Sequence, residues 1–212
     1  MSAQDHYCYS GSEVLRNLFD LRNQADLAKA EAKVSVLRLD QLRKSPVAGK
    51  FDLGHLQTIH QRIFRDIYPW AGELRTVSMS KGSSLFCRHE FISNEGERIF
   101  SQLKGESVLR GLSHDRFCER LAYYFGEINA LHPFREGNGR TQRVMLDTIA
   151  KQAGYEIDFR RMSRETMISI SCDAQVGQLE TATACFKTAV RSNPVQRKVV
   201  TKEKSVSSER GR

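Results

Sequence analysis

The chain has 212 residues, of which 40% are hydrophobic, and a formal net charge of +8. This length suits a single domain with a substantial core. No apolar run approaches the ~20 residues of a membrane span, and the N-terminal segment lacks the basic and apolar regions of a secretory signal. We therefore expect a cytoplasmic protein without a membrane partner. Five scattered cysteines with no Cys-x-x-Cys pair argue against a disulfide framework and a zinc site.

The positive charge is concentrated at the C-terminus. The last 22 residues hold seven basic and two acidic side chains, so +5 of the net +8 lies there. The nearly balanced remainder, which has no helix-turn-helix or aromatic-plus-basic motif, argues against a nucleic-acid partner. We expect a folded domain over residues 1–190 and a basic, disordered tail over residues 191–212. A solvated tail is the simpler interpretation; a signal for export as an effector, or a phosphate-binding arm, is the alternative.

Helical periodicity dominates the first 190 residues, which predicts a mainly α fold. The clearest apolar stripe has 4-3-4-3 spacing and comprises Phe117, Leu121, Tyr124, Ile128 and Leu131. Ser113 is a natural N-cap for that helix. Helices are predicted over residues 13–23, 25–43, 51–66, 91–105, 113–131, from 140 to 154, 163–171 and 176–191. His55 and His60 are five residues apart, which is not the spacing of the zinc-binding helix motif, so we interpret them as ordinary helix residues.

Residues 74–88 interrupt the helical pattern. Residues 74–79 alternate in polarity, residues 81–84 (Lys-Gly-Ser-Ser) are typical of a turn, and a second short run begins at Leu85. This arrangement predicts a short β-hairpin in an otherwise helical protein.

Residues 132–143, with the sequence HPFREGNGRTQR, form a glycine-rich connection between two predicted helices. Gly137 and Gly139 permit φ > 0, which would point successive N–H groups into one concavity. Asn138 between them can cap the following helix, whose N-terminal amides would then also face an anion. The connection is thus suited to binding a phosphate chain.

Four titratable or charged side chains flank this turn. Arg140 and Arg143, at i and i+3, share one helix face and can bind phosphate oxygens in a bidentate manner. Glu136 is a hard oxygen ligand suited to Mg²⁺, and His132 can accept a proton near neutral pH. The alternative for the whole motif is a glycine-rich helix cap with solvated arginines.

Residues 132–143 resemble the active-site signature of the Fic family, HPF, any residue, Asp or Glu, GNGR, two residues, Arg, and they meet every specified position. The Trp70-Ala71-Gly72 stretch is similar to the segment that precedes the β-hairpin flap of Fic domains. The resemblance implies a Fic-type helical bundle whose flap, about residues 74–88, pairs with an extended segment of a target protein. An inert surface hairpin is the alternative.

The resemblance implies a nucleotidyltransferase, a protein adenylyltransferase that moves AMP from ATP onto a Ser, Thr or Tyr hydroxyl and releases pyrophosphate. His132 would be the catalytic base and Glu136 would hold Mg²⁺. Arg140 would support the β-phosphate and Arg143 would clamp the γ-phosphate, while Ser171 stands where a family asparagine lies near the adenine. The complete expected set of ATP-binding residues is Lys81, Gly82, Gly137, Asn138, Gly139, Arg140, Thr141, Gln142 and Arg143.

Many Fic proteins carry an inhibitory motif, Ser/Thr-x-x-x-Glu-Gly/Asn. In this chain the Glu-Gly pairs at 95–96 and 136–137 are preceded, at the required position, by Phe91 and His132. The resemblance therefore extends to bacterial Fic toxins that are inhibited by a separate small antitoxin carrying this motif. Alternatives are a Fic enzyme with another donor (UMP, phosphocholine or phosphoryl transfer) and a non-catalytic peptide-binding module.

Overall fold

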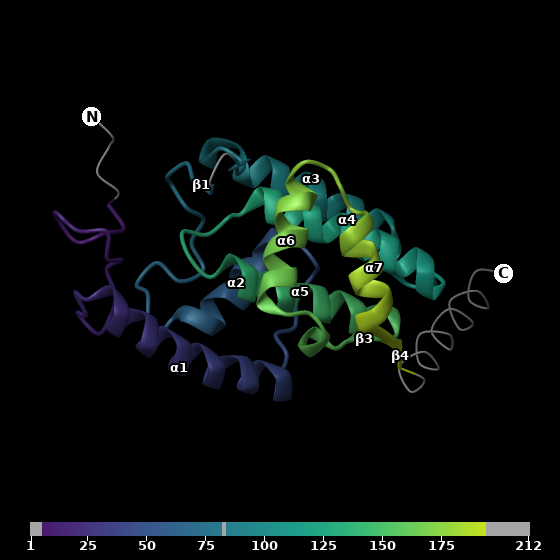
Figure 1. Ribbon diagram of the computed structural model, residues 1–212, viewed down its shortest axis with the longest axis horizontal. Helices are drawn as coiled ribbons and strands as arrows, with labels where there is room; N and C mark the ends of the chain where they lie inside the picture. Colours follow the sequence, from purple (N-terminus) through teal and green to yellow (C-terminus); the bar gives the residue numbers. More distant parts are fainter. Residues whose placement is uncertain (1–5, 82–83, 194–212) are drawn as a thin grey trace.

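The computed structural model describes residues 6–81 and 84–193, and this part of the chain contains seven α-helices and two small antiparallel sheets. The helices are α1 (Gln24–Lys44), α2 (Leu53–Phe64), α3 (Ile92–Gly105), α4 (His114–Leu131), α5 (Asn138–Ala153), α6 (Arg164–Gln175) and α7 (Glu180–Ala189). The strands are β1 (Ser80–Lys81), β2 (Ser84–Leu85), β3 (Tyr155–Ile157) and β4 (Val190–Ser192). Figure 1 shows the helices as one bundle, with α1 along its lower edge. The predicted mainly α fold with a short hairpin is confirmed.

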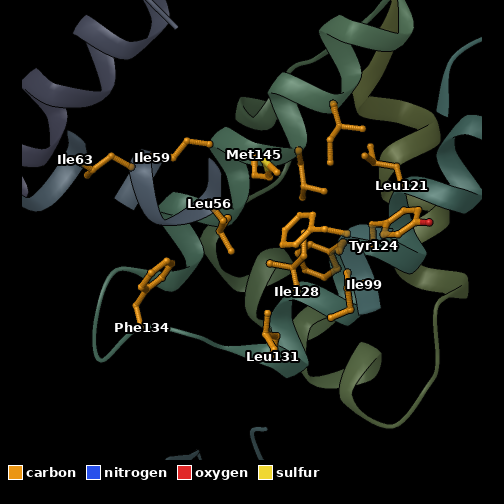
Figure 2. Packing of buried hydrophobic residues seen from close by; sticks show 14 of the residues in the cluster. Leu56, Ile59, Ile63, Ile99, Leu121, Tyr124, Ile128, Leu131, Phe134 and Met145 are labelled. Carbon is orange, nitrogen blue, oxygen red and sulfur yellow. The ribbon is translucent and has the colours of Figure 1, made fainter. Parts of the chain in front are cut away.

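Helix α4 is the centre of the bundle. It packs against α3, α5, α6 and α7, and every member of the predicted 4-3-4-3 stripe is buried in the core. Figure 2 shows Leu121, Tyr124, Ile128 and Leu131 of this stripe in one cluster with side chains of α2 and α3. Phe134, on the connection that follows α4, lies at one side of the cluster. Phe134 is fully buried and anchors this connection in the core. The core therefore holds the chain on both sides of the 132–143 segment.

The helix predicted over residues 13–23 is absent. The Asn17 side chain accepts hydrogen bonds from the N–H groups of Phe19 and Leu21 and donates to the carbonyls of Leu15 and Leu21. A buried amide that satisfies four backbone groups replaces the hydrogen bonds of a helix, a competition that periodicity alone does not reveal.

The C-terminal end of the fold also differs from the sequence prediction. Helix α7 ends at Ala189 and not at Arg191, and β4 pairs with β3, a short strand that the sequence analysis missed. A strand of three residues is too short for alternation to be recognised. Arg191 and Ser192, expected to open the tail, belong to β4, while residues 194–212 lie outside the described residues.

The predicted hairpin is present but shorter than expected. Ser80 pairs with Leu85 and Lys81 with Ser84. Beyond these pairs one more hydrogen bond joins the arms, from the N–H of Phe86 to the carbonyl of Met79. Farther from the tip the arms bond to the end of α4 and the residues that follow it: the N–H of Cys87 donates to the carbonyl of Ala130, and the N–H of Arg75 to that of Pro133. Lys81 is therefore a strand residue, not a turn residue, because the paired part of the hairpin lies at its tip.

Across the part of the chain that the structure describes, no helix combines the length and apolar character needed to span a membrane.

Candidate active site

A cavity of about 800 Å³ opens between the 132–143 segment, the hairpin and α6. It gathers residues that the sequence analysis singled out: His132, Glu136, Gly137, Asn138, Gly139, Arg140, Gln142 and Arg143. Thr141 is fully buried behind this wall. Gly82 and the side chain of Lys81 lie outside the described residues, so their expected contacts with ATP stay predictions.

His132 ends α4 at the edge of the cavity. Its backbone is left-handed (φ 43°, ψ 59°), and its N–H still donates to the Ile128 carbonyl. The helix cannot continue because Pro133 has no N–H to donate. The imidazole stacks on Phe86 of the hairpin, with ring centroids 3.7 Å apart and planes 15° from parallel. Phe86, which the sequence analysis did not consider, thus fixes the plane of the candidate base.

Arg75 holds the backbone of this helix end. Its side chain is only 2% exposed and donates to four carbonyl groups: His132 at 2.8 Å, Val77 at 2.6 Å, Leu131 at 3.5 Å, and Cys87. Burial lowers the pKa of the guanidinium, and the carbonyls at the negative end of the α4 dipole offset the cost of the charge. Arg75 therefore ties both arms of the hairpin to the candidate base, a role that nothing in the sequence distinguishes from that of an exposed arginine.

Gly137 makes the turn into α5. Its φ is +81°, and a Cβ placed there would lie 2.3 Å from the Phe64 ring, so both conformation and space require glycine. Gly139 differs from the prediction because its backbone is right-handed, inside the first turn of α5. One left-handed residue, Gly137, is enough to start the helix. At Gly139 the absence of a side chain leaves room beside the guanidinium of Arg143.

Asn138 does not cap α5, contrary to expectation. It is the first helical residue, and its side chain accepts from the N–H of Phe134 and donates to the carbonyl of Phe134. The amide closes the turn so that the segment holds its shape. The first N–H groups of α5 have no intrahelical acceptors, as in any helix, and this helix end lies on the cavity wall, a setting suited to an anion.

Glu136 lies over that helix end. Its Oε1 accepts from the N–H of Gly137 at 2.7 Å and lies 3.4 Å from the Arg140 guanidinium. The carboxylate thus stands where a phosphate oxygen would otherwise bind. Among the described residues no group of three or more His, Cys, Asp and Glu side chains could hold a metal ion. A single carboxylate nevertheless fits Mg²⁺, which takes its other ligands from phosphates and water.

Arg140 and Arg143 have different surroundings. Arg140 binds Glu31 of α1 at 2.5 Å and Ser35 at 3.2 Å and lies over the Phe64 ring. Arg143 is half-buried, and burial together with the neighbouring charge of Arg140 lowers its pKa. Residues 6–81 and 84–193 provide it with no acidic partner. Arg143 is therefore the cation that an incoming anion would neutralise.

Arg140, Glu31 and Tyr68 form a small hydrogen-bond network. Glu31 also accepts a hydrogen bond from the hydroxyl of Tyr68, and burial followed by the charge of Glu31 raises the pKa of that hydroxyl. The sequence offered no signal for Glu31, which is more than a hundred residues away. Arg140 is already paired with Glu31. It would therefore bind a phosphate while keeping its hydrogen bond to Glu31.

Thr141 and Gln142 turn their side chains inward. The Thr141 hydroxyl donates to the Gly137 carbonyl at 3.1 Å, and the Gln142 amide donates to the Phe125 carbonyl at 2.6 Å. The first contact closes the N-terminal turn of α5 itself, and the second joins α5 to α4. The expected contacts of these two residues with ATP stay predictions.

The opposite wall of the cavity is largely apolar. It is formed by the segment before α6 and by α6 itself, and includes Phe159, Met162, Met167, Ile168, Ser171 and Cys172. The Ser171 hydroxyl donates to the Met167 carbonyl, and its own carbonyl accepts from Asn129. An apolar slot beside a cationic helix end suits a flat ring joined to a phosphate chain. Apart from Ser171, these residues carried no motif by which the sequence could identify them.

Comparison with known proteins agrees with the geometry. The Fic/DOC family profile matches residues 50–150. Protein adenylyltransferase VbhT of Bartonella schoenbuchensis is 38% identical over 93% of this chain, which spans 41% of that relative. "Probable protein adenylyltransferase Fic" of Salmonella typhimurium is 36% identical over 88% of this chain and 92% of the relative.

A solved structure has the same fold. The N-terminal Fic domain of a VirB-translocated Bep effector protein from Bartonella quintana, crystallised with bound ADP, superposes with a TM-score of 0.86 at 29% identity. The superposition covers 90% of this chain and 96% of that domain. The Salmonella typhimurium relative is matched over nearly its full length, and the helical bundle and the signature segment between α4 and α5 agree with that match. This chain therefore belongs to the Fic/DOC family.

Proposed function

We propose that the protein is a protein adenylyltransferase, which transfers AMP from ATP to a Ser, Thr or Tyr hydroxyl of another protein and releases pyrophosphate. The observation that carries this proposal is the presence, in one cavity, of His132, the N-terminus of α5 and Arg143, which has no acidic partner among the described residues. Two relatives named as protein adenylyltransferases, 38% and 36% identical to the chain, support the activity. The ADP bound by the Bartonella quintana domain supports a nucleotide ligand.

The nucleotide would lie across the cavity with its base on the apolar wall and its phosphates at α5. Gly137, Asn138 and Gly139 would supply backbone N–H groups to the phosphate oxygens. Arg140 would support the β-phosphate, and Arg143 would clamp the γ-phosphate with its bidentate fork. Lys81 and Gly82 would also contact the nucleotide. This arrangement would hold the α-phosphorus near His132 for in-line attack.

His132 would act as the general base. It takes the proton from the target hydroxyl while that oxygen forms a bond to the α-phosphorus, and the bond from the α-phosphorus to the pyrophosphate oxygen breaks. The stack on Phe86 and the Arg75 hydrogen bond hold the ring and its backbone. Proton transfer of this kind contributes about 10²–10⁴-fold, and positioning and electrostatics supply the rest.

Glu136 would hold Mg²⁺ against the phosphates. When bound, the ion neutralises the charge that develops on the leaving pyrophosphate. To bind the ion, the carboxylate would release the N–H of Gly137, from which it accepts a hydrogen bond at 2.7 Å. That amide would become available to a phosphate oxygen at the same time.

The hairpin would bind the target protein. Leu85 of β2 is 82% exposed, and next to it Phe86 reaches the imidazole of His132. An extended target segment that adds to the hairpin through backbone hydrogen bonds would place its hydroxyl beside the cavity.

Control of the activity would come from a second protein. The chain contains no Ser/Thr-x-x-x-Glu-Gly/Asn motif, so it would be a toxin silenced by a small antitoxin whose glutamate pairs with Arg143. The target would be a cytoplasmic bacterial protein. Residues beyond β4 would form a basic tail outside the domain, which would serve export if the protein acts as an effector.

A panel of labelled donors tests the chemistry. Purified protein is incubated with a bacterial lysate and with ATP labelled at the α- or the γ-phosphate, UTP labelled at the α-phosphate, or labelled CDP-choline. We expect protein-bound label only from α-labelled ATP. Label from the γ-position would instead indicate phosphoryl transfer, label from UTP or CDP-choline another donor, and no label from any donor a peptide-binding module.

A further inference from the structure

His60 is a buried histidine that the sequence analysis interpreted as an ordinary helix residue. It lies on α2 with a fully buried side chain. Its ring stacks on Phe134 at 3.9 Å and lies 4.7 Å from the Phe64 ring. In Figure 2 Phe134 rises from its loop toward α2. His60 therefore sits directly beneath the signature segment, away from the cavity.

The hydrogen bonds of His60 define its tautomer. Nδ1 lies 2.8 Å from the backbone nitrogen of Gly72, and Nε2 lies 3.0 Å from the carbonyl oxygen of Glu136. The Gly72 N–H can only donate, so Nδ1 accepts and the ring proton is on Nε2, from which it is donated to Glu136. The imidazole thus joins the Trp70-Ala71-Gly72 stretch to the signature segment through one defined tautomer.

The carbonyl that His60 holds belongs to the peptide group between Glu136 and Gly137. In a planar trans peptide the C=O and the N–H point in opposite directions, and all peptide bonds between the described residues are trans. With the carbonyl directed at His60, the N–H of Gly137 must point the other way. It does so: it donates to the Glu136 carboxylate at 2.7 Å, on the cavity side.

We propose that His60 is a positioning residue that fixes the Glu136–Gly137 peptide group, so that the N–H of Gly137 faces the phosphates of the bound nucleotide. That the ligand is a nucleotide rests on the proposed function. Without the hydrogen bond from Nε2 the peptide group is free to rotate, because Gly137 has a backbone that tolerates most conformations. A rotated peptide would present a carbonyl oxygen to the phosphates in place of a donor.

Two substitutions separate the two hydrogen bonds of His60. In His60→Gln the amide nitrogen can occupy the place of Nε2 and donate to the Glu136 carbonyl. In His60→Asn the amide oxygen can take the place of Nδ1 and accept from Gly72, but no donor reaches Glu136. Both variants lose the ring that stacks on Phe134, so a difference between them reports the hydrogen bond and not the packing. His55→Gln and His55→Asn are matched controls, since His55 is buried on the same helix but bonds to Val47.

Calorimetry with ATP and with adenosine is the first readout. We expect His60→Gln to bind ATP nearly as well as the unsubstituted protein. We expect His60→Asn to bind ATP about 10- to 100-fold more weakly, which corresponds to one hydrogen bond to a charged group, while adenosine affinity is unchanged in both. The His55 variants should bind ATP normally. Equal ATP affinity in the two His60 variants would overturn the inference.

Nuclear magnetic resonance gives a second readout that needs no nucleotide. In the unsubstituted protein the ¹⁵N shifts of His60 should show a protonated Nε2 and an unprotonated Nδ1, and the opposite tautomer would contradict the inference. With ¹⁵N-glycine labelling, the Gly137 amide should shift in His60→Asn and the Gly72 amide in His60→Gln. The result is independent of catalysis: a protein that transfers no AMP but follows this pattern would refute the proposed function alone. A protein that transfers AMP with the opposite tautomer would refute the role of His60 alone.

Discussion

The buried guanidinium of Arg75 donates a 2.8 Å hydrogen bond to the backbone carbonyl of His132. The same group donates to Val77 and Cys87, which lie on opposite arms of the hairpin. The position of the candidate base and the position of the hairpin therefore depend on one side chain.

We predict that Arg75→Lys destabilises the protein by about 2–4 kcal/mol, because an ammonium cannot bond to all of these carbonyls and leaves buried acceptors unsatisfied. Urea unfolding measures this loss. AMP transfer should fall more than ATP affinity, since the hairpin and His132 lose their common support while the N-terminus of α5 does not. Arg116→Lys, at an exposed arginine paired with Glu119, should change stability by less than about 0.5 kcal/mol. Equal effects of the two substitutions would contradict this role of Arg75.

The two glycines of the signature should respond differently to alanine. Gly137→Ala forces a side chain into φ +81° and against Phe64, so we expect a loss of at least about 1–2 kcal/mol from the left-handed backbone alone. Gly139→Ala places its Cβ 3.7 Å from Arg143, an ordinary contact in a helical position where alanine is favoured. Thermal unfolding of both variants checks the contrast. A Gly139→Ala protein as unstable as Gly137→Ala would contradict this difference between the two positions.

The parts of the fold that the sequence predicted are those with a repeating pattern. The apolar stripe from Phe117 to Leu131 lies in the core. Similar apolar patterns in the other long helices predicted where they lie along the chain. The pattern failed at residues 13–23, where the polar side chain of Asn17 takes over the backbone hydrogen bonds, and at β3, which is too short to show alternation.

The sequence predicted the residues that line the candidate site, but not the residues that hold them in place. The segment 132–143 could be identified because nine positions have fixed chemistry. Arg75, His60 and Glu31 act through hydrogen bonds to residues 57, 76 and 109 positions away. Such pairings depend on how the helices pack, and no local spacing encodes them.

His60 should make stability depend on pH. Burial, opposed by the Glu136 hydrogen bond and helped by the charge of Arg140, lowers the pKa of His60 to about 4. The unfolded chain therefore takes up a proton as the pH falls below about 6.5, whereas the folded protein does so only near about pH 4. The free energy of unfolding should therefore decrease by up to about 3 kcal/mol as the pH falls from about 6.5 to about 4.

Urea unfolding at several pH values, in the unsubstituted protein and in His60→Gln, isolates this contribution. The variant has no titrating group at residue 60, so its stability should fall less steeply over the same range. Identical slopes in the two proteins would mean that His60 is not held in its neutral form by the fold.

Inhibition in trans is expected because Arg143 has no acidic partner in the part of the chain that the structure describes. A small partner that carries Ser/Thr-x-x-x-Glu-Gly/Asn should abolish AMP transfer, because its glutamate would pair with Arg143 and exclude the γ-phosphate. Replacing that glutamate by glycine should restore transfer without dissociating the complex, since one contact is lost from a larger interface. Co-purification together with the labelling assay measures both. A chain that is inactive and harmless alone, and that is activated by its partner, would contradict this regulation.

The most direct test of AMP transfer by this site compares the unsubstituted protein with His132→Ala. Both are incubated with α-labelled ATP, Mg²⁺ and a bacterial lysate, modified proteins are identified by mass spectrometry, and ATP affinity is measured by calorimetry. We predict that labelling falls by at least about 10²–10⁴-fold in the variant, with one AMP per modified hydroxyl in the unsubstituted sample and similar ATP affinity in both. Undiminished labelling by His132→Ala would contradict the account.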